Sequence, residues 1–90
     1  MDETGDSWTT KGDDDATESA VLQRVIDVHP TQLTIAELVR EVGGAEAGFA
    51  ERDAIERAVR DLVAVGLLHR NDAFVLPTRA ALRFSDLLDR

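Results

Sequence analysis

The sequence predicts a mainly α-helical α+β fold with one small β-hairpin. Two segments show the amphipathic spacing of helices, and a third ends at Gly66, where the spacing changes to that of short strands. The chain has 90 residues, 43% of them hydrophobic, and no cysteine, so no disulfide or cysteine-bound zinc supports the fold. We therefore expect one domain over residues 17–90, preceded by a disordered acidic tail over residues 1–16.

Most of the negative charge of the chain lies near its N-terminus. Residues 1–19 contain seven acids and one lysine, whereas the remaining residues hold 11 acids and nine arginines, and the formal net charge is −8. The segment is rich in Gly, Ser, Thr and Asp, which predicts disorder. Three roles stay open for it: a solvating extension, a binding motif built on Trp8, or an acidic mimic of nucleic acid that inhibits the chain's own basic surface.

The first helix is expected to begin after Asp15 or Thr17. Glu18 follows Asp15 at capping-box spacing, and Thr17 is itself a good N-cap residue. Pro30 ends the helix, because a proline disfavours helical geometry at the residue before it. The apolar stripe of this helix consists of Val21, Leu22, Val25 and Ile26.

A second amphipathic helix is predicted after Thr34. Thr34 and Glu37 have capping-box spacing at its start, and Gly43-Gly44 ends it. Its apolar residues recur at i, i+3, i+4 and i+7, which places them on one face. They are Ile35, Leu38, Val39 and Val42.

A third helix is predicted to end at Gly66, which supplies the left-handed position of a helix terminus. Asp53 and Glu56 have capping-box spacing at its start, and a start near Ala50 also remains open. The side chain of Phe49, in the preceding connector, is expected to be buried in the core. The inward-facing residues of this helix are Ile55, Val59, Leu62 and Val63.

A tight β-hairpin is predicted after Gly66. Residues 67–70 form a short strand, and residues 73–76 are an apolar run that contains β-forming residues. The polar Asn71-Asp72 pair between them fits a two-residue turn.

Pro77-Thr78 begins a last helix over residues 79–88. Its apolar face is expected to pack on the first helix or on a partner subunit, with Leu82 pointing roughly opposite. A homodimer through the first and last helices is plausible, because a core this small supplies only about 3–5 kcal/mol of net stability. The residues of the apolar face are Ala80, Ala81, Phe84, Leu87 and Leu88.

The order of these pieces resembles the winged helix-turn-helix of bacterial transcriptional regulators of the multiple-antibiotic-resistance and arsenic-repressor types. The similar motifs are Thr34-Ile35-Ala36-Glu37-Leu38 in the supporting helix and Gly66-Leu67-Leu68 after the recognition helix, and the resemblance covers roughly residues 20–88. It implies a brief strand at Gln32-Leu33 that pairs with the hairpin, or wing. It also implies that the third helix and the wing contact duplex DNA.

The candidate DNA-binding residues are arginines and one histidine. With the apolar residues inward, Arg57 and Arg60 point outward from the third helix at about 100° per residue. Arginine is suited to bidentate contact with guanine edges and with phosphates. The full set expected to contact DNA is Arg52, Arg57, Arg60, His69 and Arg70.

The same arginines also fit a surface that does not bind DNA. Arg57 has acids four residues away on both sides, at Asp53 and Asp61, and Glu56 stands four residues before Arg60. Four acids face three arginines between Glu51 and Asp61, whereas phosphate binding needs a net positive potential. The alternative is an acidic winged-helix module that binds a protein partner.

An enzymatic role is not expected. His29 and His69 have no partners at metal-ligand or catalytic-triad spacing, and no glycine-rich phosphate loop is present. We therefore expect no catalytic residue, no metal and no cofactor. No targeting signal and no apolar run long enough to cross a bilayer is found in the sequence, which predicts a cytoplasmic protein that does not bind membranes.

Overall fold

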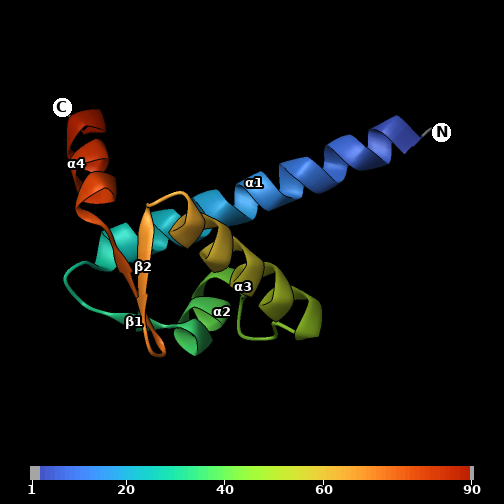
Figure 1. Cartoon of the computed structure of the whole chain (residues 1–90). Helices are drawn as coiled ribbons and strands as arrows, with labels where there is room; N and C mark the ends of the chain where they lie inside the picture. The colour runs from blue at the N-terminus through green and yellow to red at the C-terminus, as the bar shows by residue number, and fades with distance from the viewer. Residues whose placement is uncertain (1–2, 90) are drawn as a thin grey trace.

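Helices make up most of the structure, a computed structural model that describes the backbone of residues 3–89 and the side chains of residues 13–89. A small antiparallel sheet packs with them, so the predicted α+β class is confirmed (Figure 1). The helices are α1 (Glu3–Val28), α2 (Ile35–Gly43), α3 (Phe49–Ala64) and α4 (Arg79–Leu88).

The sheet has three strands in the order β1-β3-β2, with β1 at Leu33–Thr34, β2 at Leu68–Asn71 and β3 at Phe74–Pro77. The first strand thus lies one residue later than expected, but it does pair with the hairpin. The turn is also one residue later than predicted, at positions 72 and 73. Asp72 there has a φ of 57°, a left-handed conformation that Asp tolerates better than most residues.

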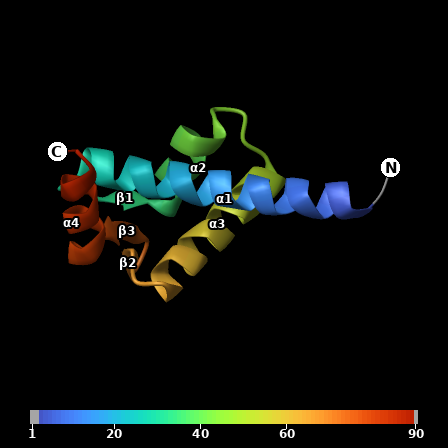
Figure 2. The ribbon, with the colours of Figure 1, turned by 90° about the horizontal axis from the view of Figure 1, so that it is seen from above.

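The first helix starts earlier than expected. It begins at Glu3, and the expected domain boundary between residues 16 and 17 falls inside it. Thr17 does not cap a helix start, since its hydroxyl donates to the Asp13 carbonyl one turn earlier (2.9 Å). The helix runs through this polar segment, and its N-terminal turns project from the body of the molecule (Figures 1 and 2).

One small core lies where the second half of α1 meets α2, α3 and the sheet. The predicted inward residues of α1 and α2 lie in this core, with Val21 and Leu38 fully buried, except for Ile26, which is half-buried and lines a hollow toward α4. Leu22 and Val42 are partly buried at its edge. The buried apolar residues are Val21, Val25, Leu33, Ile35, Leu38, Val39, Ile55, Ala58, Val59, Leu62, Leu68, Val75 and Ala81.

The predicted capping box at the start of α2 is confirmed. The Thr34 hydroxyl accepts a hydrogen bond from the Glu37 backbone N–H (3.1 Å), and the Glu37 carboxylate accepts one from the Thr34 backbone N–H (2.8 Å). At the other end Gly44 has a φ of 95°, and its N–H donates to the Arg40 carbonyl (3.0 Å). Both ends of this short helix are therefore satisfied locally.

The start of α3 corrects two expectations. The helix begins at Phe49 and not at Asp53, because the Glu51 carboxylate accepts from the Gly48 backbone N–H (2.9 Å). Ala50, the alternative start, is closer to the observed one. Phe49 does not plug the core, since it stands in the first turn with its side chain 86% exposed.

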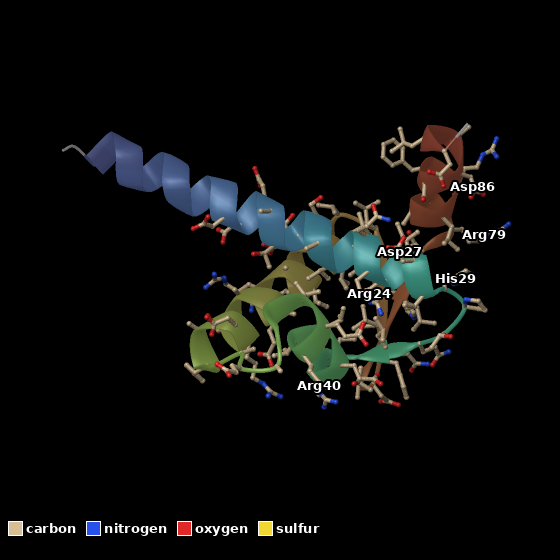
Figure 3. The ribbon with its side chains drawn as sticks, turned by 180° about the vertical axis from the view of Figure 1, so that it is seen from behind. Arg24, Asp27, His29, Arg40, Arg79 and Asp86 are labelled. Carbon is tan, nitrogen blue, oxygen red and sulfur yellow. The ribbon has the colours of Figure 1, made fainter. Side chains whose placement is uncertain are left out.

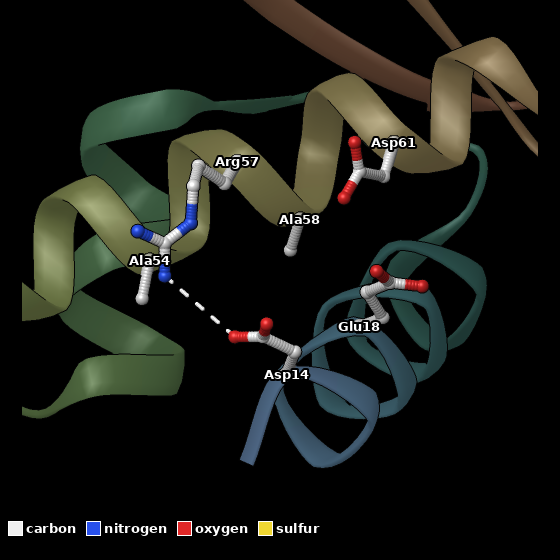
Figure 4. Close-up of a pocket in the computed structure, with 6 residues that line it drawn as sticks. All are labelled: Asp14, Glu18, Ala54, Arg57, Ala58 and Asp61. Atoms are coloured by element: carbon white, nitrogen blue, oxygen red, sulfur yellow. Dashed lines mark ion pairs between the residues drawn. The ribbon is translucent and has the colours of Figure 1, made fainter. Parts of the chain in front are cut away.

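The buried face of α3 is shifted from the predicted one. Val63 is 37% exposed, whereas Ala58 is buried and takes its place beside the expected Ile55, Val59 and Leu62. Ala58 lies where α1 crosses α3 (Figure 4). A small side chain at that point lets two helices approach closely.

The predicted stop at Gly66 is confirmed. Gly66 has a φ of 87°, its N–H donates to the Val63 carbonyl (3.1 Å), and the N–H of Leu67 donates to the Leu62 carbonyl (2.9 Å). These two bonds form the Schellman arrangement that closes a helix on a left-handed residue. The chain then enters β2 directly.

The last helix starts as predicted but packs differently. The Thr78 hydroxyl accepts from the Ala81 backbone N–H (3.2 Å), so Thr78 is the N-cap. Of the expected apolar face only Ala81 is buried, while its larger residues are exposed. Leu82 is half-buried and lines a hollow with Ile26 of α1, so the side expected to point away faces α1.

We predict that Leu38→Ala lowers the free energy of unfolding by about 2–5 kcal/mol, because it leaves a cavity at a fully buried position. Denaturant unfolding measures this change. Phe49→Ala is the matched control, and its exposed side chain predicts a change within about 0.5 kcal/mol. Equal losses in the two variants would contradict the assigned core.

The capping box also predicts a pH dependence of stability. The hydrogen bond from the Thr34 backbone N–H, and then that from the Thr34 hydroxyl, hold the pKa of Glu37 below its ordinary value. A carboxyl with a lowered pKa in the folded state stabilises the protein above its unfolded pKa. That contribution is lost as the pH falls through the folded pKa.

The stability difference between the wild type and Glu37→Gln should therefore be largest near neutral pH and shrink in acid. Denaturant unfolding at several pH values measures it. The control is Glu46→Gln, an exposed residue of the connector between α2 and α3. A wild-type advantage over Glu37→Gln that stays constant from neutral pH into acid would contradict the assigned hydrogen bonds.

Candidate functional site

All five residues predicted to contact DNA are exposed on two consecutive elements. Arg52, Arg57 and Arg60 lie on α3, and His69 and Arg70 lie on β2. The helical spacing therefore correctly placed the arginines of α3 outside the core. Their ionic partners differ from one arginine to the next.

Arg57 is held between two carboxylates. Its Nη1 lies 3.0 Å from Asp53 Oδ2 on the same helix, and its Nη2 lies 3.6 Å from Asp14 Oδ1 on α1 (Figure 4). The sequence predicts the first pair, since Asp53 stands one turn earlier. The second pair depends on how α1 packs on α3, so no local spacing indicates it. The Arg57 side chain therefore lies partly against α1 and partly in solvent.

A small hollow separates α1 from α3 beside Arg57. Figure 4 shows Asp14 and Glu18 on α1 opposite the α3 residues. Its volume of about 20 Å³ holds about one water molecule and is too small for an organic ligand. Its lining residues are Asp14, Glu18, Ala54, Arg57, Ala58 and Asp61.

The other arginines of α3 differ in their surroundings. Arg52 lies 3.5 Å from Glu56, and this pair takes the place of the expected pair between Glu56 and Arg60. The expected pair between Arg57 and Asp61 does not form either. Among the described residues, Arg60 makes no ion pair, so it is the arginine of α3 whose charge is least neutralised.

The hairpin positions Arg70 close to its turn. Leu68 is the buried residue of β2, and the rest of the strand is exposed, including His69. The Arg70 Nε donates to the Asp72 carbonyl (3.2 Å), which fixes the base of the guanidinium. Among the described residues no carboxylate pairs with that guanidinium, so its remaining nitrogens keep donors for an anion.

The charge balance around α3 is negative. Four acids and three arginines lie between Glu51 and Asp61, and α1 adds Asp14 and Glu18 on one side. Within the described part of the chain no group of three or more His, Cys, Asp or Glu residues is arranged to hold a metal ion. The surface around α3 thus offers ionic and hydrogen-bonding contacts of both signs.

No family model, curated protein or solved structure matches this chain. Among the helices of the described residues, none has the length and apolar character needed to cross a membrane.

We predict that Asp14 and Arg57 interact only weakly in terms of stability, because both side chains are about half exposed. A double-mutant cycle with Asp14→Asn and Arg57→Gln should give a coupling of about 0.2–1 kcal/mol, falling with added salt. Denaturant unfolding measures it. A coupling that is unaffected by salt would contradict an exposed ion pair at this position.

Proposed function

We propose that this chain is a winged-helix DNA-binding protein, a small transcriptional regulator that contacts duplex DNA with α3 and uses the hairpin of β2 and β3 as its wing. The order of elements supports the proposal: a short strand and α2, then α3, then a hairpin that pairs with that strand. An α-helix with its side chains fits the major groove of B-DNA.

The observation that carries the proposal is the exposure of Arg60 on α3 and of Arg70 on the hairpin. Arg60 has no ion pair among the described residues, and only the Nε of Arg70 is engaged, by a carbonyl. Both therefore keep donors for phosphate or guanine contact. His69, beside Arg70, is also exposed.

A second candidate is a winged-helix module that binds a protein. The observation in its favour is that Arg52 and Arg57 are already paired with carboxylates. A duplex would have to compete with those acids, since most non-specific DNA affinity comes from neutralising phosphates. A protein partner does not need a net positive surface, because charges of both signs can pair across such a contact.

Binding to a random-sequence duplex at low salt, measured by fluorescence anisotropy, tests the proposal. Arg60→Ala and Arg70→Ala should each weaken binding, and each arginine that contacts a phosphate should lower the salt slope by about 1. Arg24→Gln is the control, because this substitution removes one positive charge from α1 (Figure 3), where Arg24 pairs with Glu41. Equal losses in all three variants would show that net charge, and not this surface, determines binding.

Removing the carboxylate that faces Arg57 from α1 should strengthen DNA binding. Asp14→Asn frees one side of the Arg57 guanidinium and removes a negative charge beside α3. Asp27→Asn is the matched control, since it removes the same charge elsewhere on α1. The expected result is a lower Kd for Asp14→Asn than for Asp27→Asn. No binding below millimolar concentration by the wild type or by Asp14→Asn would overturn the proposal and favour a protein partner.

A further inference from the structure

A hollow lies between the last turns of α1 and the side of α4 that faces them. Its volume of about 450 Å³ is in the range of small-molecule binding sites, whereas the hollow beside Arg57 holds about one water molecule. Figure 3 shows its two walls from behind, with Asp27 and His29 at the end of α1 and Asp86 on α4. The hollow can therefore hold a small organic molecule.

Three carboxylates line this hollow: Asp27 of α1, Asp86 of α4 and Asp89, the C-cap of α4. No arginine or lysine stands among its described lining residues. Asp27 accepts a hydrogen bond from the Gln23 amide (2.7 Å), but none of the three acids makes an ion pair with a described residue. Like charges on the walls of a concave surface add to a negative potential, which concentrates cations there.

The backbone adds to this negative potential, because the last turns of two helices line the hollow. The first helix ends at Val28 and α4 at Leu88, and neither has a basic residue in its last turn. The C-terminal end of a helix carries a partial negative charge, which lysine or arginine commonly offsets. Asp27 and Asp86 stand in these two turns instead. A cation bound in the hollow takes the place of the missing basic side chains.

The acids of the hollow are spread over its walls and not gathered around one point. Asp86 and Asp89 stand about one helical turn apart on α4, and Asp27 stands on the other wall. In the part of the chain that the structure describes, no group of three or more His, Cys, Asp or Glu residues is arranged to hold a metal ion. The charge pattern therefore fits a cation with several positive groups along a chain better than one compact ion.

Apolar side chains form the more buried part of the lining. Ile26 of α1 and Leu82 of α4 are half-buried there, and the exposed Leu88 adds to the apolar surface. An alkyl chain can lie along such a surface while its charged groups stay at the carboxylates and in water. The Ser85 hydroxyl and the His29 imidazole add acceptors for ammonium N–H groups. Aliphatic polyamines combine these properties, because methylene segments separate their ammonium groups.

We propose that the hollow between α1 and α4 binds an aliphatic polyamine. Its methylene segments lie on Ile26 and Leu82, and its ammonium groups reach Asp27 on one wall and Asp86 and Asp89 on the other. The bound amine thereby bridges α1 and α4. None of the five residues predicted to contact DNA lines the hollow, so this proposal and the proposed DNA binding can fail independently.

Isothermal titration calorimetry of the full chain with spermidine at low salt tests the site. The wild type should bind one spermidine per chain, and more weakly as salt is added. Asp27→Asn and Asp86→Asn should each raise the Kd up to about fivefold, as expected for an exposed ion pair, and the variant with both changes about tenfold. No saturable binding by the wild type below millimolar concentration would overturn the proposal.

The matched control is a variant with Glu46→Gln and Asp61→Asn, which changes two exposed acids outside the hollow. It loses the same charge as the variant with Asp27→Asn and Asp86→Asn, but its Kd for spermidine should change less than about twofold. Circular dichroism checks that the helix content of both variants is unchanged. An equal rise of the Kd in the two would show that spermidine responds to net charge only, and the site would be overturned.

Ligands of equal charge test the contribution of the alkyl chain. The diamine putrescine and Mg²⁺ both carry two positive charges, but only putrescine gains from contact with Ile26 and Leu82. Putrescine should bind more tightly than Mg²⁺ and shift the NMR amide signals of residues 23–29 and 82–89, and Leu82→Ala should remove part of that advantage. Equal affinities, or shifts at acids throughout the chain, would overturn the proposal. Tighter binding of a lysine peptide with the charge of spermidine would overturn it in favour of a basic protein segment.

Discussion

The packing of the second half of α1 against α3 and the sheet is the interaction on which the rest of the structure depends. Val21 and Val25 are almost completely buried there, together with Val59 of α3 and Val75 of β3. Burial of each such side chain contributes about 1.5–3 kcal/mol, a large share of the stability of a domain this small. The same contact fixes where α1 crosses α3, so it determines which face of α3 is covered and which arginines remain open.

Local signals in the sequence predicted most of the elements, because their causes are local. The capping box of Thr34 and Glu37 and the left-handed Gly66 depend on neighbouring residues, and both are as expected. The errors occur where tertiary packing decides. Ala58 is buried because α1 approaches it, whereas Phe49 is exposed although it is strongly apolar. A prediction from the spacing of large apolar residues overlooks an alanine that is buried where two helices cross.

The candidate site was predictable to a similar extent. Spacing on α3 places Arg57 and Arg60 outside the core, and the pair of Arg57 with Asp53 follows from one helical turn. The contact of Arg57 with Asp14 joins two helices that are distant in the sequence, so only the packed structure indicates it. That contact bears most directly on function, because it adds an acidic neighbour to the helix proposed to meet DNA.

Thr78 connects the base of the hairpin to the helices before and after it. The Thr78 N–H and hydroxyl donate to the Leu67 and Gly66 carbonyls (3.1 and 2.7 Å), while its hydroxyl accepts from the first turn of α4. One residue thus ties together the end of α3, the base of the hairpin and the start of α4. Because the same hydroxyl contacts both sides, the base of the hairpin and the start of α4 are joined at one residue outside the buried core.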